Sequence, residues 1–286
     1  MTAVNRTLLQ PAAWQARRDA HVARVRQWTD PVRQRRSRGE RHPVLDFLFT
    51  YYSHRPAKLL RWHPGPGVAL AGAEEYLRWP AYRRTGHGVE LGPLPEARRS
   101  SVEFVHALLT ATAARKPHLG CFGLHEWAMV YRAADVRHED WPLRLGAEGT
   151  DAVVESLPVR CTHFDAFRFF TQEARPLNAS QPQRTDQLAL EQPGCLHAGM
   201  DLYKWAYKLD PYVPSELVAD CFELALDIRS LDMRASPYDL APLGYAPVRI
   251  ETAEGRARYR REQAGFTERA RPLRGRLIAL CEELLG

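Results

Sequence analysis

The chain has 286 residues, of which 45% are hydrophobic and 26% charged, and a formal net charge of +6. This composition is typical of a folded globular protein and excludes general disorder. No segment has the roughly 18 to 20 consecutive apolar residues of a membrane span, and the N-terminus lacks the apolar core of a secretion signal, so we expect a cytoplasmic protein without a membrane partner.

The first third of the chain predicts two helices and a small β element. A basic N-terminal helix is expected over residues 11–37, with an interruption or kink at Pro31, because a proline inside a helix removes a hydrogen bond. The apolar stretch VLDFLFTYY (44–52) predicts a buried second helix. Glycine and proline punctuate residues 62–93, where VALAG and GVELG predict short strands.

The rest of the chain predicts a helical core over residues 94–233, followed by a basic C-terminal helix over residues 252–285. A polar loop is expected up to about residue 158. We therefore expect a mainly α protein, a single domain over residues 1–286 built as a helical bundle-like array with a small β-hairpin element. The helices of the core are expected at residues 94–116, 123–134, 161–174, 195–209 and 215–233.

The last two helices of the core each carry a narrow polar stripe. On a helical wheel the four polar residues of the first helix lie within about 60° of one another, and Ser215 can cap the second helix, whose stripe is acidic. The short connection DPYVP predicts that the helices are antiparallel neighbours. The two stripes consist of His197, Asp201, Lys204 and Lys208, and of Glu216, Asp220, Glu223 and Asp227.

Antiparallel packing would pair Lys208 with Glu216 and Lys204 with Asp220, and would leave three carboxylates beside one histidine. Like charges in a poorly solvated site raise a carboxylate pKa or recruit a cation, whereas stripes that face water do neither. The first outcome predicts an iron- or manganese-dependent oxygenase or hydrolase, helped by His125, Glu126 or His163. Its expected ligands are His197, Asp201, Glu223 and Asp227.

Other patterns point to nucleic acid or to acid–base chemistry. The arginine-rich segments 17–42 and 255–276 can attract a polyanion, or they can be the solvated faces of amphipathic helices. The pairs His125–Glu126 and His163–Asp165 lie in apolar segments, as general bases or hydrogen-bonded core histidines do. The five scattered cysteines form no CxxC, and Walker A, GxGxxG, GxSxG and HExxH patterns are absent.

Three stretches, HPVLDFLFTYYSHRPAKLLRWHPG, LHAGMDLYKWAYKL and LDMRASPYDL, resemble a family of bacterial proteins catalogued as 3-methyladenine DNA glycosylases. The resemblance covers most of the chain. It implies a DNA-repair hydrolase that breaks the N-glycosidic bond of an alkylated purine without a metal cofactor. The helix-hairpin-helix with its downstream aspartate and the HEAT-like repeat of other glycosylases are not found in this sequence.

Such an enzyme needs a carboxylate, aromatic walls for an extruded base and a basic face. We expect DNA to be bound mainly through its phosphates; a non-catalytic nucleic-acid-binding protein is the remaining alternative. The expected catalytic residues are Asp201, then Asp165, with His163 or His197 orienting water. The expected stacking residues are Trp62, Tyr203 and Trp205, and the expected phosphate ligands are Arg55, Lys58 and Arg61.

Overall fold

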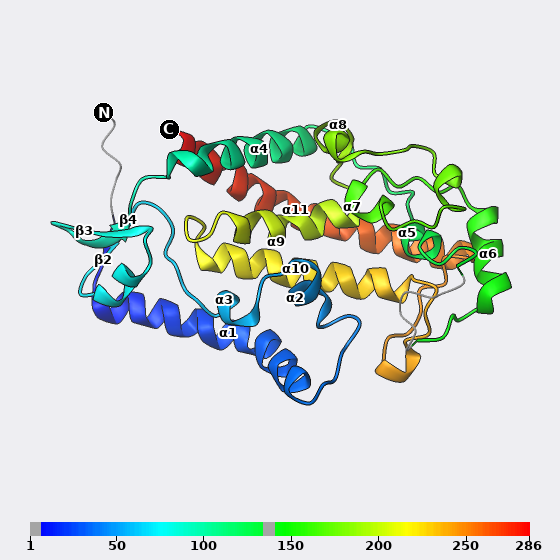
Figure 1. Cartoon of the computed structure of the whole chain (residues 1–286), viewed down its shortest axis with the longest axis horizontal. Helices are drawn as coiled ribbons and strands as arrows, with labels where there is room; N and C mark the ends of the chain where they lie inside the picture. Colours follow the sequence, from blue (N-terminus) through cyan, green and yellow to red (C-terminus); the bar gives the residue numbers. More distant parts are fainter. Residues whose placement is uncertain (1–6, 134–140) are drawn as a thin grey trace. The chain divides into compact units, whose positions relative to one another are not determined.

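The fold is given by a computed structural model, which describes residues 7–133 and 141–286 (Figure 1). The described residues are mainly helical and contain one small four-stranded sheet, which confirms the predicted fold class. Within these two ranges, no helix combines the length and the apolar character that crossing a membrane requires.

The chain divides into two compact units, and each unit is assembled from separate segments. The first unit comprises Met1–His106, Tyr203–Glu223 and Arg276–Gly286, and the second comprises Ala107–Leu202 and Leu224–Gly275. The single domain expected over residues 1–286 stays a prediction.

The sheet belongs to the first unit and has the strand order β1-β2-β4-β3. Strand β1 (Thr7–Leu9) pairs in parallel with β2 (Val68–Leu70), while β4 (Gly88–Leu91) pairs in antiparallel fashion with both β2 and β3 (Tyr82–Thr85). The strands expected in VALAG and GVELG are therefore confirmed as β2 and β4. Strands β1 and β3 were missed, because TLL is too short to show alternation and YRRT is largely polar.

The first unit also contains the basic N-terminal helix, α1 (Pro11–Ser37), with the predicted bounds. The helix continues through Pro31, so it is not interrupted there. The helix expected in VLDFLFTYY is shorter than predicted. The other elements of this unit are α2 (Phe47–Tyr51), α3 (Pro56–Leu59), the 3₁₀ helix η1 (Glu74–Arg78) and parts of α4 (Glu96–Ala113), α9 (Leu196–Lys208), α10 (Ser215–Arg234) and α11 (Ala253–Leu285).

An aromatic cluster forms the core beside the sheet. Trp14 of α1 donates its indole N–H to the carbonyl of Ala71 at 2.9 Å, and its ring meets Tyr76 edge to face at 5.8 Å. Such buried aromatic pairs contribute through area and through ring geometry. The buried members of this cluster are Trp14, Trp62, Leu70, Ala73, Tyr76, Tyr82, Val89, Leu91 and Tyr212.

The acidic stripe of α10 is neutralised by arginines in the first unit, not by the lysines of α9 that the sequence predicts. Glu216 accepts from Arg17 at 2.9 Å, and Asp220 accepts from Arg24 at 2.7 Å and from Arg276 at 2.8 Å. The expected pairing was wrong because the cations come from α1 and α11, which are far away in the sequence. Lys204 and Lys208 instead lie over the Trp205 ring.

Two buried histidines make the stability of the first unit depend on pH. Burial, followed by the nearby Lys58 and Arg61, lowers the pKa of His54 to about 4. Burial, followed by Arg61, also lowers the pKa of His63 to about 4. A histidine with a lowered folded-state pKa stabilises the fold fully above its unfolded pKa, and this stabilisation is lost as the pH falls towards the folded pKa.

We expect the free energy of unfolding to fall on acidification from about pH 8 to about pH 5, with His54 alone contributing roughly 2 kcal/mol of the loss. Urea unfolding at both pH values measures the change. His54→Gln should lose about 2 kcal/mol less than the wild type over this range. His87→Gln, in the exposed β3–β4 turn, should behave as the wild type does. An unaltered pH dependence in His54→Gln would contradict the prediction.

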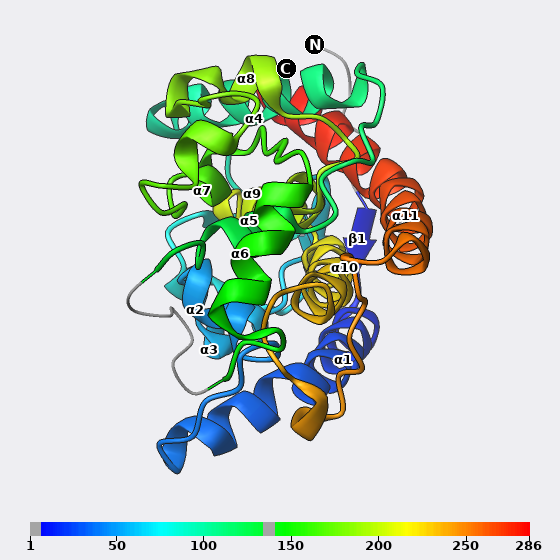
Figure 2. The same ribbon diagram turned by 90° about the vertical axis from the view of Figure 1, so that its right-hand side faces the viewer.

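The second unit contains several short helices with the remaining parts of α4, α9, α10 and α11. A helix, α6 (Gly146–Ser156), lies where the sequence predicts a polar loop, and it lies beside α5 (Leu124–Ala128) in both views (Figures 1 and 2). Residues 134–140, where the expected loop begins, are outside the described ranges. The other short helices are α7 (Phe164–Phe167), α8 (Gln187–Leu190), η2 (Arg175–Leu177), η3 (Arg184–Asp186) and η4 (Ala241–Leu243).

Helix α6 was missed because its sequence, GAEGTDAVVES, has glycines and β-branched residues of low helix propensity. Its stability comes from packing, since Val153 and Val154 are buried, and Thr150 donates its hydroxyl to the carbonyl of Gly146 at 2.6 Å. Helices α5 and α7 are shorter than predicted.

Candidate metal centre

Six ionisable side chains gather in the interior of the second unit. They form two groups of three, and in each group the possible ligand atoms lie within 4.8 Å of one another. None of the six residues is more than 7% exposed. The first group is His125, His197 and Asp232, and the second group is His163, Glu191 and Asp201.

Helix α9 contributes one residue to each group. His197 and Asp201 are four residues apart, so they lie on the same face of the helix, one turn from each other. The ring of His197 stacks against His163, with centroids 5.0 Å apart, and meets His125 edge to face at 4.5 Å. His197 therefore joins the two groups.

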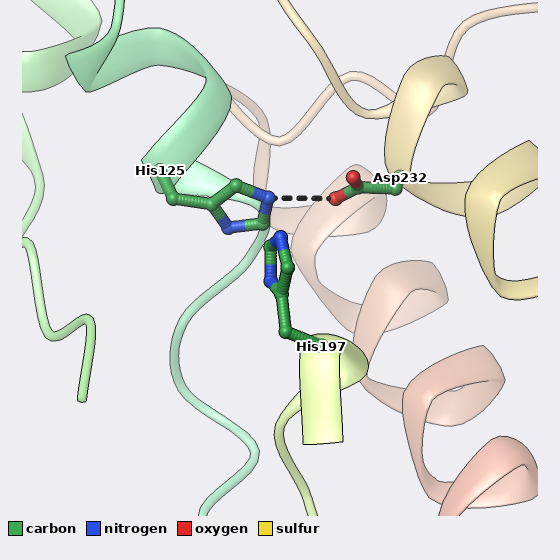
Figure 3. Close-up of side chains that lie close together, drawn as sticks. All are labelled: His125, His197 and Asp232. Atoms are coloured by element: carbon green, nitrogen blue, oxygen red, sulfur yellow. Dashed lines mark ion pairs between the residues drawn. The ribbon is translucent and has the colours of Figure 1, made fainter. Parts of the chain in front are cut away.

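The first group is built around a histidine–aspartate pair (Figure 3). His125 Nε2 of α5 lies 3.0 Å from Asp232 Oδ1 of α10. Arg229, one turn before Asp232, donates from Nη1 to Asp232 Oδ2 at 3.0 Å and to Glu126 Oε1 at 2.7 Å. The buried carboxylates thus share one buried guanidinium group.

This environment shifts two histidine pKa values in opposite directions. Burial alone would lower the pKa of His125, but the Asp232 carboxylate outweighs it and raises that pKa well above its ordinary value. Burial, followed by the proximity of His125 and His163, holds the pKa of His197 well below its ordinary value. His197 is therefore a neutral imidazole, the form that binds metal ions.

In the second group, two carboxylate oxygens lie near one ring nitrogen of His163. His163 Nε2 lies 3.4 Å from Asp201 Oδ2 and 3.8 Å from Glu191 Oε2. Among the described residues, neither ring nitrogen of His163 has a hydrogen-bond partner. Donors bound at about 2.1 Å to one ion lie roughly 3.0 to 3.4 Å apart, so an ion here would draw Glu191 in by about half an ångström.

Other side chains orient Glu191. Gln187 donates to Glu191 Oε2 at 2.9 Å, and the hydroxyl of Thr112 donates to Oε1 at 3.4 Å. Such outer hydrogen bonds fix the direction of a ligating carboxylate.

Among the described residues of this unit, buried carboxylates outnumber buried guanidinium groups. The carboxylates are those of Glu126, Glu191, Asp201 and Asp232, and the guanidinium groups are those of Arg229 and Arg274. Such an interior favours protonated histidines, nearby cationic side chains or a bound cation, because an uncompensated buried charge is unfavourable.

The first group is reached through a cavity that His125 and His197 both line. Cys121 also lines it, and its Sγ lies 3.8 Å from His125 Nδ1. A surface pocket of about 540 Å³ shares four lining residues with this cavity. The shared residues are Cys121, Arg160, Thr162 and Gln192.

The structure brings together three of the four residues predicted as catalytic, His163, His197 and Asp201. Asp165 is elsewhere, where it forms ion pairs with Arg168 at 3.4 Å and Arg184 at 3.5 Å.

The alternative metal set of His197, Asp201, Glu223 and Asp227 is not one of the two groups found among the described residues. Asp227 is half exposed and accepts from Arg269 at 2.6 Å, and Glu223, in the first unit, accepts from Arg24 at 2.6 Å. These two acidic residues pair with arginines, and the carboxylates that lie near His163 and His125 are instead those of Glu191, Asp201 and Asp232.

The residues expected to stack a base are buried in the first unit. Trp62 belongs to the aromatic core, Tyr203 bonds His54 Nδ1 through its hydroxyl at 2.6 Å, and Trp205 meets Phe104 edge to face at 5.8 Å. A base could reach them only after this core opened. The expected phosphate ligands Arg55, Lys58 and Arg61 are exposed.

Sequence reasoning missed Glu191 and Asp232. A weak signal exists for each residue. Glu191 is the single charged residue in the stretch LALEQPGC, and Asp232 lies three residues after Arg229 on the apolar side of α10. Neither signal says which distant segment supplies the partner.

Three imidazoles and several carboxylates suit first-row metal ions such as iron or manganese.

Comparisons of this chain with protein-family models, with curated proteins and with solved structures found no match.

Proposed function

We propose that this chain is a metal-dependent enzyme whose ion, iron or manganese, is held by His163, Glu191 and Asp201. The observation that carries the proposal is the buried His163 ring, which has no hydrogen bond among the described residues while two carboxylates face it at 3.4 and 3.8 Å. Leaving a buried polar group unbonded is unfavourable, and a metal ion held by the two carboxylates would satisfy the imidazole.

His197 would lie beside this ligand set, and it lines the cavity. Its ring stacks on His163, and its lowered pKa keeps a nitrogen lone pair free to accept a hydrogen bond from a substrate or a water molecule. A bound ion polarises substrate oxygens and activates water at neutral pH. The adjacent His125, held by Asp232, is placed to accept or deliver a proton beside the cavity.

Metal analysis of protein purified without chelators tests the proposal. We expect about one iron or manganese ion per wild-type chain and less than about a tenth of that in His163→Ala, because removal of a ligand weakens binding strongly. His106→Ala is the matched control, since His106 lies 3.4 Å from Glu282 at the surface of the first unit. It should keep the wild-type content.

Equal metal content in His163→Ala and the wild type would contradict this ligand set.

Base excision, which the resemblance implies, stays a prediction. The exposed side chains of Arg55, Lys58 and Arg61 support it. Release of methylated base from alkylated DNA by fully metal-free protein would favour it over the metal enzyme.

A further inference from the structure

The surface pocket of the second unit has the size and the lining of a small-molecule site. Its volume of about 540 Å³ lies within the range of ligand pockets. Pro117, Leu119 and Ala179 give it apolar walls, and Thr162 and Ser180 add hydroxyl groups. Such a lining fits the apolar body of an organic ligand with a few polar groups to orient it.

Two arginines give the pocket a positive charge. Arg160 and Arg260 both line it, no acidic residue does, and neither arginine forms an ion pair within the described ranges. Arg260 lies over the Phe122 ring, 5.4 Å from its centre, which restrains the guanidinium group beside the pocket. Arginine binds carboxylates and phosphates through its planar fork.

The pocket leads towards the metal cluster. Arg160, Thr162 and Cys121 line both the pocket and the cavity that contains His125 and His197. None of the described residues that line the cavity is acidic either. A ligand whose anionic group stays with the arginines would therefore lie next to the entrance of this cavity, which is itself only large enough for water.

We infer that this pocket binds a small organic anion, with a carboxylate or phosphate held by Arg160 and Arg260 and an apolar body against Pro117, Leu119 and Ala179. That this anion is the substrate of the cluster rests on the proposed function. Binding itself does not, because none of these five residues belongs to the proposed metal ligands.

Calorimetric titration of the full chain in the presence of a chelator tests the inference. The probes are benzoate, phenyl phosphate and the neutral benzamide. The wild type should bind one of the anions at least about tenfold more tightly than benzamide, and the double variant Arg160→Gln/Arg260→Gln should lose this preference. Arg258→Gln, an exposed position on α11 whose arginine pairs with Glu262, should keep it.

A preference for phenyl phosphate or for benzoate identifies the anionic group, and either supports the inference. Equal binding of anions and benzamide by the wild type, or an unchanged preference in a folded double variant, overturns it. Metal content is measured on separate samples of the same proteins, purified without chelator. Anion binding by a chain that takes up no metal would overturn only the proposed function, and metal uptake without anion binding would overturn only the pocket.

Discussion

Replacing Arg229 by methionine is expected to lower the free energy of unfolding by about 3 to 5 kcal/mol, because it removes the cation from a buried ion-pair network. Arg229 is 1% exposed and donates to Glu126 and Asp232, which are buried in the same unit. Methionine fills similar space but leaves both carboxylates without this donor. Urea unfolding in the presence of a chelator measures the loss independently of any metal.

Two comparisons separate the loss of buried charge balance from the loss of packing. Arg269→Met removes a half-exposed partner of Asp227 and should cost no more than about 1 kcal/mol. Replacing the whole network, Glu126→Gln/Arg229→Met/Asp232→Asn, should restore much of the stability lost in Arg229→Met. If Arg229→Met cost no more than Arg269→Met, water would have to reach this network, and the cluster would not be a low-dielectric site.

The long helices could be predicted from the sequence, α9 and α10 from a polar stripe that continues over several turns and α1 from Pro11 at its start. The bounds of α1, α9, α10 and α11 agree with the predicted ranges within two residues. Helices α5 and α7 belong to segments that are buried on most sides, so periodicity does not show where each helix ends. For α6, tertiary packing overrides weak local propensity.

The sequence could predict only those residues of the candidate site that lie together on one helix. The i, i+4 spacing places His197 and Asp201 on one face of α9, and the sequence identifies both. Their partners come from segments distant in the chain, such as His163 and Glu191. The choice of Asp227 and Glu223 followed from assigning contacts to the nearest helix in sequence, whereas these two acids pair with arginines from other segments.

Asp201→Asn is expected to abolish stabilisation by metal without weakening the metal-free fold. At free metal about 1,000 times the dissociation constant, the wild type should gain roughly 4 kcal/mol of unfolding free energy, and the variant should gain little. In chelator the variant should be at least as stable as the wild type, because it removes the repulsion between the Asp201 and Glu191 carboxylates, which lie within 4.8 Å of each other, and asparagine has the same shape.

The change in unfolding free energy that Asp201→Asn causes in the presence of chelator shows whether Asp201 is a metal ligand or a structural residue. If Asp201 served only to hold a charged His163, Asp201→Asn would destabilise the metal-free chain by several kcal/mol, and metal would stabilise both proteins equally. Asp227→Asn provides the surface comparison, since its carboxylate is half exposed and pairs with Arg269. It should respond to metal as the wild type does. If Asp201 destabilises the metal-free fold but is needed for stabilisation by metal, its role is to bind the metal. The unfolding free energy must therefore be measured on the same variant both in chelator and with added metal.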